Sequence, residues 1–315
     1  MTRFVTMGET MGVGVTAVGR PLRTAGSIRL STAGAESTVA IGLARLGHSV
    51  EWVGAVGDDE LGTRVLRDLA AEGVGLTYAR TDTTAPTGFM IRERATPAQT
   101  RVTYFRRDSA GGRLRGSDAI SALDAGSDIL HVSGVTLLLS EASAEAVREA
   151  FAHARSLGVR VSFDVNHRKT LPLSDQAAVL FSSLLGDVDL LFVGHDELDV
   201  LGVDGTAEEA AAILLKMGPE EVVVKQGSGP SYAANATGTT ASCPSSKVQV
   251  VDIVGAGDAF AAGYLGAVAE GLDLGERLRW GATCAAYAIA SEGDWEGLPG
   301  RDALQQGRPE TETLR

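Results

Sequence analysis

Three consecutive segments within residues 128–165 decide the fold class: DILHVSG (128–134), EASAEAVREAFAHARSLG (141–158) and VRVSFDV (159–165). The first and third are short runs rich in aliphatic residues, whereas the middle segment carries apolar residues at the three- and four-residue spacing of a helix. A strand, a helix and a second strand in this order predict a β-α-β unit whose strands run parallel.

The same alternation extends along most of the chain. We predict a doubly wound α/β body, in which a mostly parallel sheet is covered by helices on both faces. Ligands of such sheets bind beyond the carboxyl ends of the strands. Further strand-like segments are SVEWVGAVG (49–57), DLLFVG (189–194) and EVVVK (221–225). Further segments with helical spacing are AESTVAIGLARLG (35–47), DELGTRVLRDLAAEG (59–73), DQAAVLFSSLLG (175–186) and TAEEAAAILLKMG (206–218).

Two segments, 11–33 and 86–107, break this alternation because they look like short strands with turns and no helix. They suit a small β-sheet standing on the body. We predict that residues 1–10, 34–84 and 112–315 form the body and that residues 11–33 and 85–111 form the small sheet. The final GRPETETLR (307–315) is polar and predicts a loose tail.

Composition excludes several classes of protein. A formal charge of −12 argues against nucleic acid as a partner, since phosphate backbones need a basic surface. The two cysteines form no CxxC and the five histidines no HExxH, so neither a disulfide framework nor a zinc site is predicted. No uncharged apolar run is long enough to span a bilayer. We therefore expect a cytoplasmic protein without a membrane partner.

The stretch GVGVTA (12–17) matches the GxGxxA form of the dinucleotide fingerprint. That motif needs a helix to begin within it, but Gly19 and Pro21 follow almost at once. We expect a glycine-bearing β-turn there instead. An NAD-dependent enzyme remains an alternative, which thermal shift with NAD against ATP would test. No GxxxxGK[ST] occurs, which excludes a Walker-type phosphate loop.

The stretch VDIVGAGDAF (251–260) predicts a site for an anion. A helix that begins here exposes backbone N–H groups, and the small residues let a ligand approach them closely. Asp258 could then take a proton from the group that the anion reacts with. In the alternative interpretation, Asp258 only stabilises the helix dipole and the glycines allow close packing. The stretch alone leaves both open.

This stretch resembles the C-terminal motif of the ribokinase-like (PfkB) carbohydrate kinases, commonly D-T/P-V-G-A-G-D-x-F. Among its subfamilies the chain is most similar to the 2-keto-3-deoxygluconate kinases, through GAExxxA (34–40), TGFMIRER (87–94), RVTYFRRDSAG (101–111) and DVNHR (164–168). Further family motifs occur in family order: AGAESTVAIGLARLG (33–47), VGAVGDDELG (53–62), VSFDVNHR (161–168) and VVVKQGSGP (222–230).

The resemblance implies a sugar kinase that uses ATP and Mg²⁺, with the sugar between the body and a β-sheet lid. It implies that Asp258 is the catalytic base and that the backbone N–H groups of Gly255, Ala256 and Gly257 stabilise the transferring phosphoryl group. It further implies a homodimer formed through the lids, or a higher homo-oligomer.

The resemblance also implies binding residues. Arg106 favours a sugar acid, because a guanidinium binds a carboxylate with two hydrogen bonds. Glu197 would be linked to Mg²⁺, and Asp252 with AIASEG (288–293) to a monovalent cation such as K⁺. The implied nucleotide contacts are Lys225, Gly227, Gly229, Gly255 and Gly257. The implied sugar contacts are Gly34, Phe89, Tyr104, Arg106, Arg168 and Asp258.

Five positions depart from the family pattern and leave the sugar open. Phe89 loses a hydroxyl and Thr38 loses an amide, both at positions expected to face the sugar, where unpaired polar groups decide discrimination. The others are Ala33, Gly194 and Ile253. We therefore predict a kinase of a primary hydroxyl on a small sugar acid, with 2-keto-3-deoxygluconate as the best candidate. The alternatives are a kinase of a neutral sugar or nucleoside (fructose, ribose, adenosine) and a catalytically silent binding protein.

Overall fold

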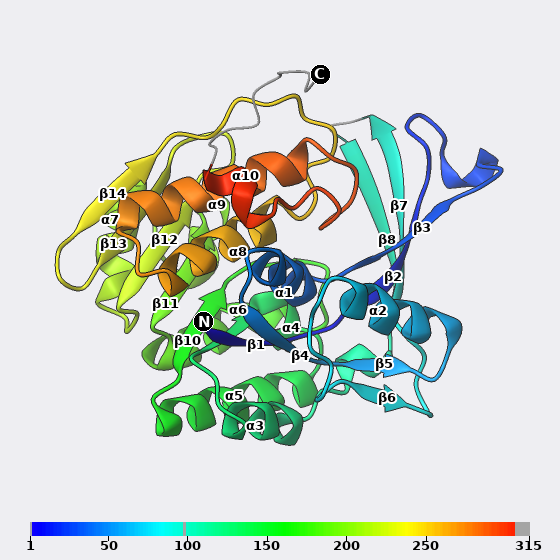
Figure 1. Ribbon diagram of the computed structural model, residues 1–315, viewed down its shortest axis with the longest axis horizontal. Coiled ribbons are helices and arrows are strands. Elements are labelled where there is room, and N and C mark those ends of the chain that lie inside the picture. The colour runs from blue at the N-terminus through cyan, green and yellow to red at the C-terminus, as the bar shows by residue number, and fades with distance from the viewer. Residues whose placement is uncertain (1, 97–98, 306–315) are drawn as a thin grey trace.

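A computed structural model describes residues 2–96 and 99–305, and its main feature is an eight-stranded sheet (Figure 1). Neighbouring strands run parallel except at one edge, where β13 and β14 are antiparallel to their neighbours. The predicted fold class is confirmed. In sheet order the strands are β14 (Thr240–Cys243), β13 (Ser231–Asn235), β12 (Glu221–Lys225), β11 (Leu190–Gly194), β10 (Arg160–Asp164), β9 (Ile129–Ser133), β1 (Arg3–Met7) and β4 (Ser49–Val53).

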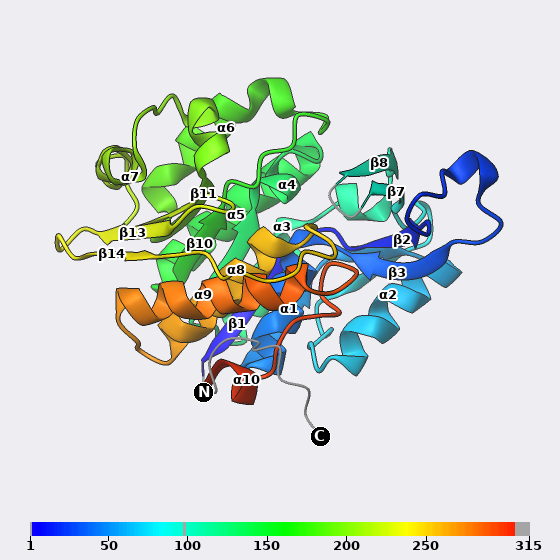
Figure 2. The same cartoon turned by 90° about the horizontal axis from the view of Figure 1, so that it is seen from above.

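Helices cover both faces of this sheet, as the view from above shows (Figure 2). The central strands are buried on both sides: Leu191 of β11 points into one core and Phe192 into the other. One face carries α3 (Gly116–Asp124), α5 (Glu141–Leu157), α6 (Ala177–Leu184) and α7 (Ala207–Leu215). The other carries α1 (Ala35–Arg45), α8 (Ala256–Ala269), α9 (Leu274–Ile289) and α10 (Arg301–Gln305).

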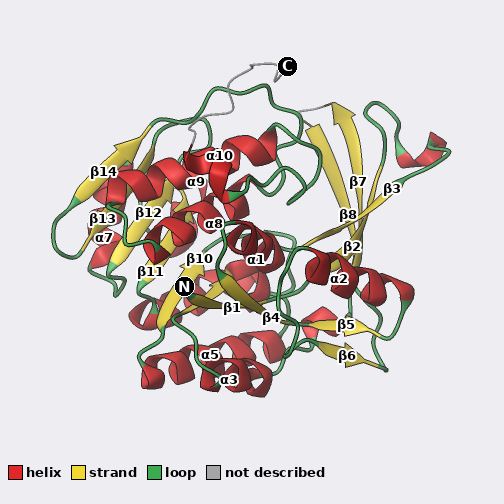
Figure 3. Ribbon diagram, viewed as in Figure 1, coloured by secondary structure: helices red, strands yellow, loops and turns green. Residues whose placement is uncertain are grey.

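Shorter elements complete the body. A two-stranded sheet pairs β5 (Ala55–Gly57) with β6 (Arg80–Asp82), beside α2 (Glu60–Ala71) (Figure 3). A four-residue helix, α4 (Gly134–Leu137), follows β9. The 3₁₀ segments are η1 (Leu22–Thr24), η2 (Ala110–Gly112), η3 (Ser174–Gln176), η4 (Leu185–Asp187) and η5 (His195–Leu201).

A separate four-stranded sheet, which we call the lid, stands beside the body (Figure 1). Its order is β3 (Arg29–Ala33), β2 (Met11–Val15), β7 (Phe89–Thr96) and β8 (Gln99–Phe105). These strands lie within 11–33 and 85–111, the ranges predicted for the small sheet. The inner face of the lid is apolar and buried at Met11, Val13, Val15 and Met90. The division of the chain into two structural units stays a prediction.

The β-turn predicted at residues 12–17 is wrong, because residues 11–15 form strand β2. A methyl group at Gly12 would lie 2.8 Å from Leu61 Cδ2, and one at Gly14 would lie 2.8 Å from Ile28 Cδ1. The two glycines therefore make room for neighbouring side chains rather than for a dinucleotide. After β2 the next α-helix of the described chain begins only at Ala35, so the helix that the fingerprint requires does not form.

Sequence patterns gave no indication of the edge strands β13 (SYAAN) and β14 (TASC), which are short and carry mostly small and polar residues. The tail predicted at 307–315 lies outside the described residues. Across residues 2–96 and 99–305, none of the helices combines the length and the apolar character that crossing a bilayer demands.

Candidate active site

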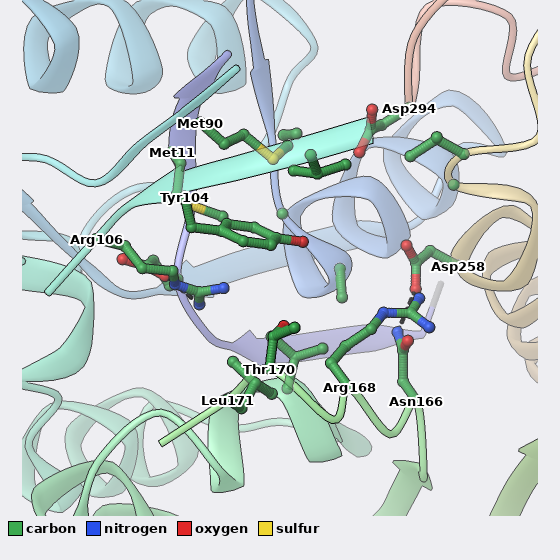
Figure 4. Close-up of a pocket in the computed structure, with 18 of the residues that line it drawn as sticks. Met11, Met90, Tyr104, Arg106, Asn166, Arg168, Thr170, Leu171, Asp258 and Asp294 are labelled. Carbon is green, nitrogen blue, oxygen red and sulfur yellow. Dashed lines mark hydrogen bonds and ion pairs between the residues drawn. The ribbon is translucent and has the colours of Figure 1, made fainter. Parts of the chain in front are cut away.

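A cavity of about 120 Å³ lies where the lid meets the carboxyl ends of the body strands (Figure 4). The lid contributes Met11, Met90, Tyr104 and Arg106 together with Ala33, Arg92 and Val102, and the body supplies the rest of the lining. Six residues singled out from the sequence meet there: Gly34, Tyr104, Arg106, Arg168, Gly255 and Asp258.

The floor of the cavity is the first turn of α8, which begins as predicted from the GAGD stretch. Gly255 precedes the helix in the left-handed conformation, with φ 76°, and a methyl group there would lie 2.5 Å from the carbonyl oxygen of Asp294. Only glycine fits this position without strain. The N–H groups of the first turn have no partner within the helix, so they can bind an anion.

Asp258 stands in this first turn and points toward Asn166 and Arg168 (Figure 4). Burial raises its pKa to about 7, and the carboxylate of Asp164 adds to the rise. Arg168 and Lys225 oppose it by favouring the charged form. A carboxyl group with such a pKa can accept a proton near neutral pH.

Asn166 was missed by sequence reasoning, although it lies inside the DVNHR segment. It follows β10, is buried, and donates from Nδ2 to Oδ1 of Asp258 at 2.9 Å. Its φ of 34° is positive, a conformation that non-glycine residues rarely adopt. A strained backbone that directs an amide at a buried carboxylate marks Asn166 as part of the site.

Arg106 reaches the cavity from β8, next to the ring of Tyr104 at 5.4 Å from its centroid (Figure 4). Its guanidinium forms an ion pair with Glu9, which is 3% exposed and which sequence reasoning also missed. Glu9 accepts a second hydrogen bond from Ser109 Oγ at 2.6 Å. The arginine is therefore held in place at the edge of the cavity.

The structure places Phe89 outside the cavity lining, and the sugar contact expected of it stays a prediction. Strand residues alternate between faces, and Met90 and Arg92 are the residues of β7 that line the cavity. Phe89 lies on the outer face of the lid against the ring of Phe105, at 6.4 Å between centroids.

Two buried arginines of β7 tie the lid to the loops around α8. Arg92 forms an ion pair with Asp294 and lies 3.7 Å from Oδ2 of Asp252. Arg94 donates to Glu292 and to the carbonyl of Val251, both at 2.5 Å. The carboxylate of Asp252 thus already faces a guanidinium, and the monovalent cation expected there stays a prediction.

Three of the residues assigned to the nucleotide, Lys225, Gly227 and Gly229, lie outside the cavity lining at the end of β12, whereas Gly255 lines the cavity. Lys225 ends that strand, and Gly227 turns the chain with φ 57° before Gly229. Nearby, Glu197 accepts from the N–H of His167 with Oε1 and from the N–H of Gly194 with Oε2, at 2.8 and 2.7 Å. Each carboxylate oxygen keeps a free lone pair, so Glu197 fits Mg²⁺ held through water.

A sheet covered by helices on both faces, with an anion-binding helix terminus, a raised carboxyl pKa and a covering lid, suits phosphoryl transfer to a small molecule. The pfkB family carbohydrate kinase model matches residues 1–301. The chain belongs to the PfkB family of carbohydrate kinases. Membership of this kinase family implies the use of ATP and speaks against the NAD-dependent alternative.

Individual proteins similar to this kinase support the assignment. The 2-dehydro-3-deoxygluconokinase of Bacillus subtilis (strain 168) is 33% identical over 305 residues, 95% of this chain and 93% of the relative. The 2-dehydro-3-deoxygalactonokinase of Haloferax volcanii is 33% identical over 294 residues, 92% of each. The crystal structure of a PfkB protein from Polaromonas sp. JS666 superimposes with a TM-score of 0.87 at 32% identity, covering 97% of this chain and 99% of that one.

Proposed function

We propose that this kinase phosphorylates a primary hydroxyl of a small sugar acid, with 2-keto-3-deoxygluconate as the first candidate. One observation carries the proposal: Arg106 of the lid and Asp258 of α8 line the same cavity. A guanidinium suits the carboxylate end of such a substrate, and an aspartate suits the hydroxyl end. The relatives named for 2-dehydro-3-deoxy sugar acids support this substrate class.

In the proposed reaction Asp258 accepts the proton of the sugar hydroxyl. The hydroxyl oxygen forms a bond to the γ-phosphorus of ATP, and the bond to the β,γ-bridging oxygen breaks, its electron pair leaving with ADP. The N–H groups of Gly255, Ala256 and Gly257 donate to the transferring phosphoryl group. Gly34 and Arg168 would contact the sugar or its phosphate, since both line the cavity.

The nucleotide would lie along the turn at Gly227 and Gly229, with its phosphates at the first turn of α8. Mg²⁺, when bound with ATP, would neutralise phosphate charge, and Glu197 is the residue proposed to hold it through water. A role for K⁺ at Asp252 would have to coexist with the ion pair to Arg92.

We also propose a homodimer formed through the lids. The outer lid face exposes apolar side chains, with Ile28 37%, Leu30 44% and Phe105 57% exposed. Such a patch is typical of an interaction surface. Sedimentation of the wild type against Phe105→Asp would test it, because a charge in the interface should shift the protein to monomer. The use of ATP supports the cytoplasm as its compartment.

A second candidate is a kinase of a neutral sugar or nucleoside. The observation that favours it is the ion pair between Arg106 and Glu9, which already neutralises the guanidinium. A neutral substrate would leave that pair undisturbed.

ADP release with Mg²⁺-ATP tests these proposals across 2-keto-3-deoxygluconate, its galacto epimer, gluconate, fructose, ribose and adenosine, with Asp258→Asn as the control. Turnover on a keto acid that is lost in Asp258→Asn supports the hypothesis that the substrate is a sugar acid. Turnover only on fructose, ribose or adenosine would replace it with the second candidate, and undiminished activity of the variant would remove Asp258 from its role.

A further inference from the structure

A buried ion pair lies directly beneath the first turn of α8. Lys225 Nζ is 2.8 Å from Oδ1 and 2.6 Å from Oδ2 of Asp164. The Asp164 side chain is 2% exposed and the Lys225 side chain 16%. A charge pair in such surroundings contributes little to stability compared with apolar residues of the same size, so its presence calls for another role.

The strand register explains how the two side chains meet across the strand between them. Lys225 of β12 pairs with Gly194 of β11, and Asp164 of β10 pairs with Phe192 of the same strand. Residues 192 and 194 share one face of β11. A methyl group at Gly194 itself would lie 2.6 Å from Oδ1 of Asp196 and 3.0 Å from Oε2 of Glu197.

The ammonium of Lys225 also lies close to the anion-binding turn. A methyl group at Gly257 would lie only 3.4 Å from Lys225 Nζ. Although burial alone would lower the pKa of Lys225, the carboxylates of Asp164 and Glu197 raise it above its usual value. A permanent positive charge is thus fixed beside the N–H groups of the helix terminus, where it adds to their attraction for an anion.

We propose that Lys225 is a catalytic residue of the phosphoryl transfer and that Asp164 positions it. Its ammonium donates to a γ-phosphoryl oxygen while the sugar oxygen bonds to phosphorus, the β,γ-bridging bond breaks toward ADP and the hydroxyl proton moves to Asp258. This inference rests on the proposed function, which places the transfer at the first turn of α8. It goes beyond nucleotide binding, because the charge would act mainly in the transition state.

Kinetics of Lys225→Met and of the double variant Asp164→Asn/Lys225→Met test the role. The double variant is needed because Lys225→Met alone leaves a buried carboxylate without its partner. We expect kcat to fall roughly 10²–10³-fold, as for the loss of one transition-state donor. The KM values for ATP and sugar should change less than about threefold. Lys216→Met, at an exposed position after α7, is the matched control and should keep wild-type kinetics.

The pH profile tests the electrostatic coupling between Lys225 and Asp258. Lys225 lowers the pKa of Asp258, while Asp164 and Glu36 raise it and Arg168 lowers it. The acid limb of kcat should therefore move to higher pH in Lys225→Met and to lower pH in Asp164→Asn. Because this coupling acts whether or not Lys225 contacts the phosphoryl group, the catalytic role is judged from kcat on the plateau above the limb.

A binding measurement decides the role without any sugar. We expect Mg²⁺-ADP with aluminium fluoride, a mimic of the transferring phosphoryl group, to bind the wild type more tightly than Mg²⁺-ADP does. This gain in affinity over Mg²⁺-ADP alone should be lost in the double variant. A double variant that keeps the gain, or a kcat within threefold of wild type, would overturn the inference. Failure of the wild type on every sugar would contradict the proposed function instead, and the fluoride comparison would still decide the role of Lys225.

Discussion

Asn166 donates a hydrogen bond from Nδ2 to Oδ1 of Asp258 at 2.9 Å, across 92 residues of chain. The donor follows a body strand and the acceptor opens α8, so the bond fixes the carboxylate relative to the sheet. One oxygen of Asp258 is thereby occupied, and the other remains for the substrate hydroxyl.

Removing this amide should impair the base. In Asn166→Gly we expect kcat to fall roughly 10–100-fold, since small misplacements of reacting groups are costly. The acid limb of the pH profile should move to higher pH, because a hydrogen-bond donor to the charged carboxylate lowers its pKa and the variant lacks this donor. Glycine tolerates the φ of 34° at this position, whereas Asn166→Ala adds backbone strain. If Asn166→Gly keeps wild-type kcat, the hydrogen bond has no part in catalysis.

The wild-type pH profile should show Asp258 directly. Its pKa of about 7 means that the base is charged above this pH and protonated below it. At pH 6 about a tenth of the enzyme is then ionised, so kcat/KM should be about tenfold lower than at pH 8 or above. Initial rates from pH 5 to 9 measure this. A profile that is flat between pH 5 and 8 would remove Asp258 as the base.

The same pKa predicts that Asp258→Asn stabilises the inactive protein. A carboxyl group whose pKa rises on folding stabilises the native state only while protonated, and this contribution is lost as pH rises through 7. The variant should therefore have a higher Tm than wild type at pH 8, by roughly 2–4 °C for each kcal/mol of stability that the ionised carboxylate costs the wild type. The difference in Tm should vanish near pH 4. Turnover should fall roughly 10²–10⁴-fold. Thermal unfolding at both pH values checks the sign, and a lower Tm at pH 8 would contradict it.

Arg106 should decide the affinity for a sugar acid. We expect Arg106→Gln to raise KM for the keto acid by about 30–1,000-fold, the cost of truncating a hydrogen-bonded charge pair at roughly 2–4 kcal/mol. The KM for ATP should not change. Arg107→Gln removes a neighbouring exposed charge and is the control. Equal, small effects of the two substitutions would favour a neutral substrate.

Arg92 should be important for stability, because it is 1% exposed and has two carboxylate partners, Asp294 and Asp252. We expect Arg92→Met to lower the free energy of unfolding by about 3–5 kcal/mol, since it leaves buried charges unpaired. Arg101→Met, on the exposed surface of β8, should cost less than about 0.5 kcal/mol. Denaturant titration of both variants measures the difference, and equal midpoints would contradict the structural role of Arg92.

Much of the fold could be predicted because its signals are local. The helical spacing of 141–158 and the aliphatic runs on either side specify a β-α-β unit without reference to distant residues. The GAGD stretch likewise marks a helix start through small residues and a positive φ at Gly255. The edge strands β13 and β14 could not be predicted in this way, since they are stabilised by pairing, β13 with β12 and β14 with β13, rather than by their own pattern.

The sequence by itself determined the α/β class, the family motifs and the position of Asp258 at a helix terminus, because each depends on neighbours a few residues apart. Tertiary structure decided which side chains surround that aspartate. Asn166, Lys225 and Asp164 reach it only because parallel strands bring their carboxyl ends to one edge of the sheet. It also decided that Phe89 faces outward, because a side chain's face depends on strand register, and a shift of one residue reverses it.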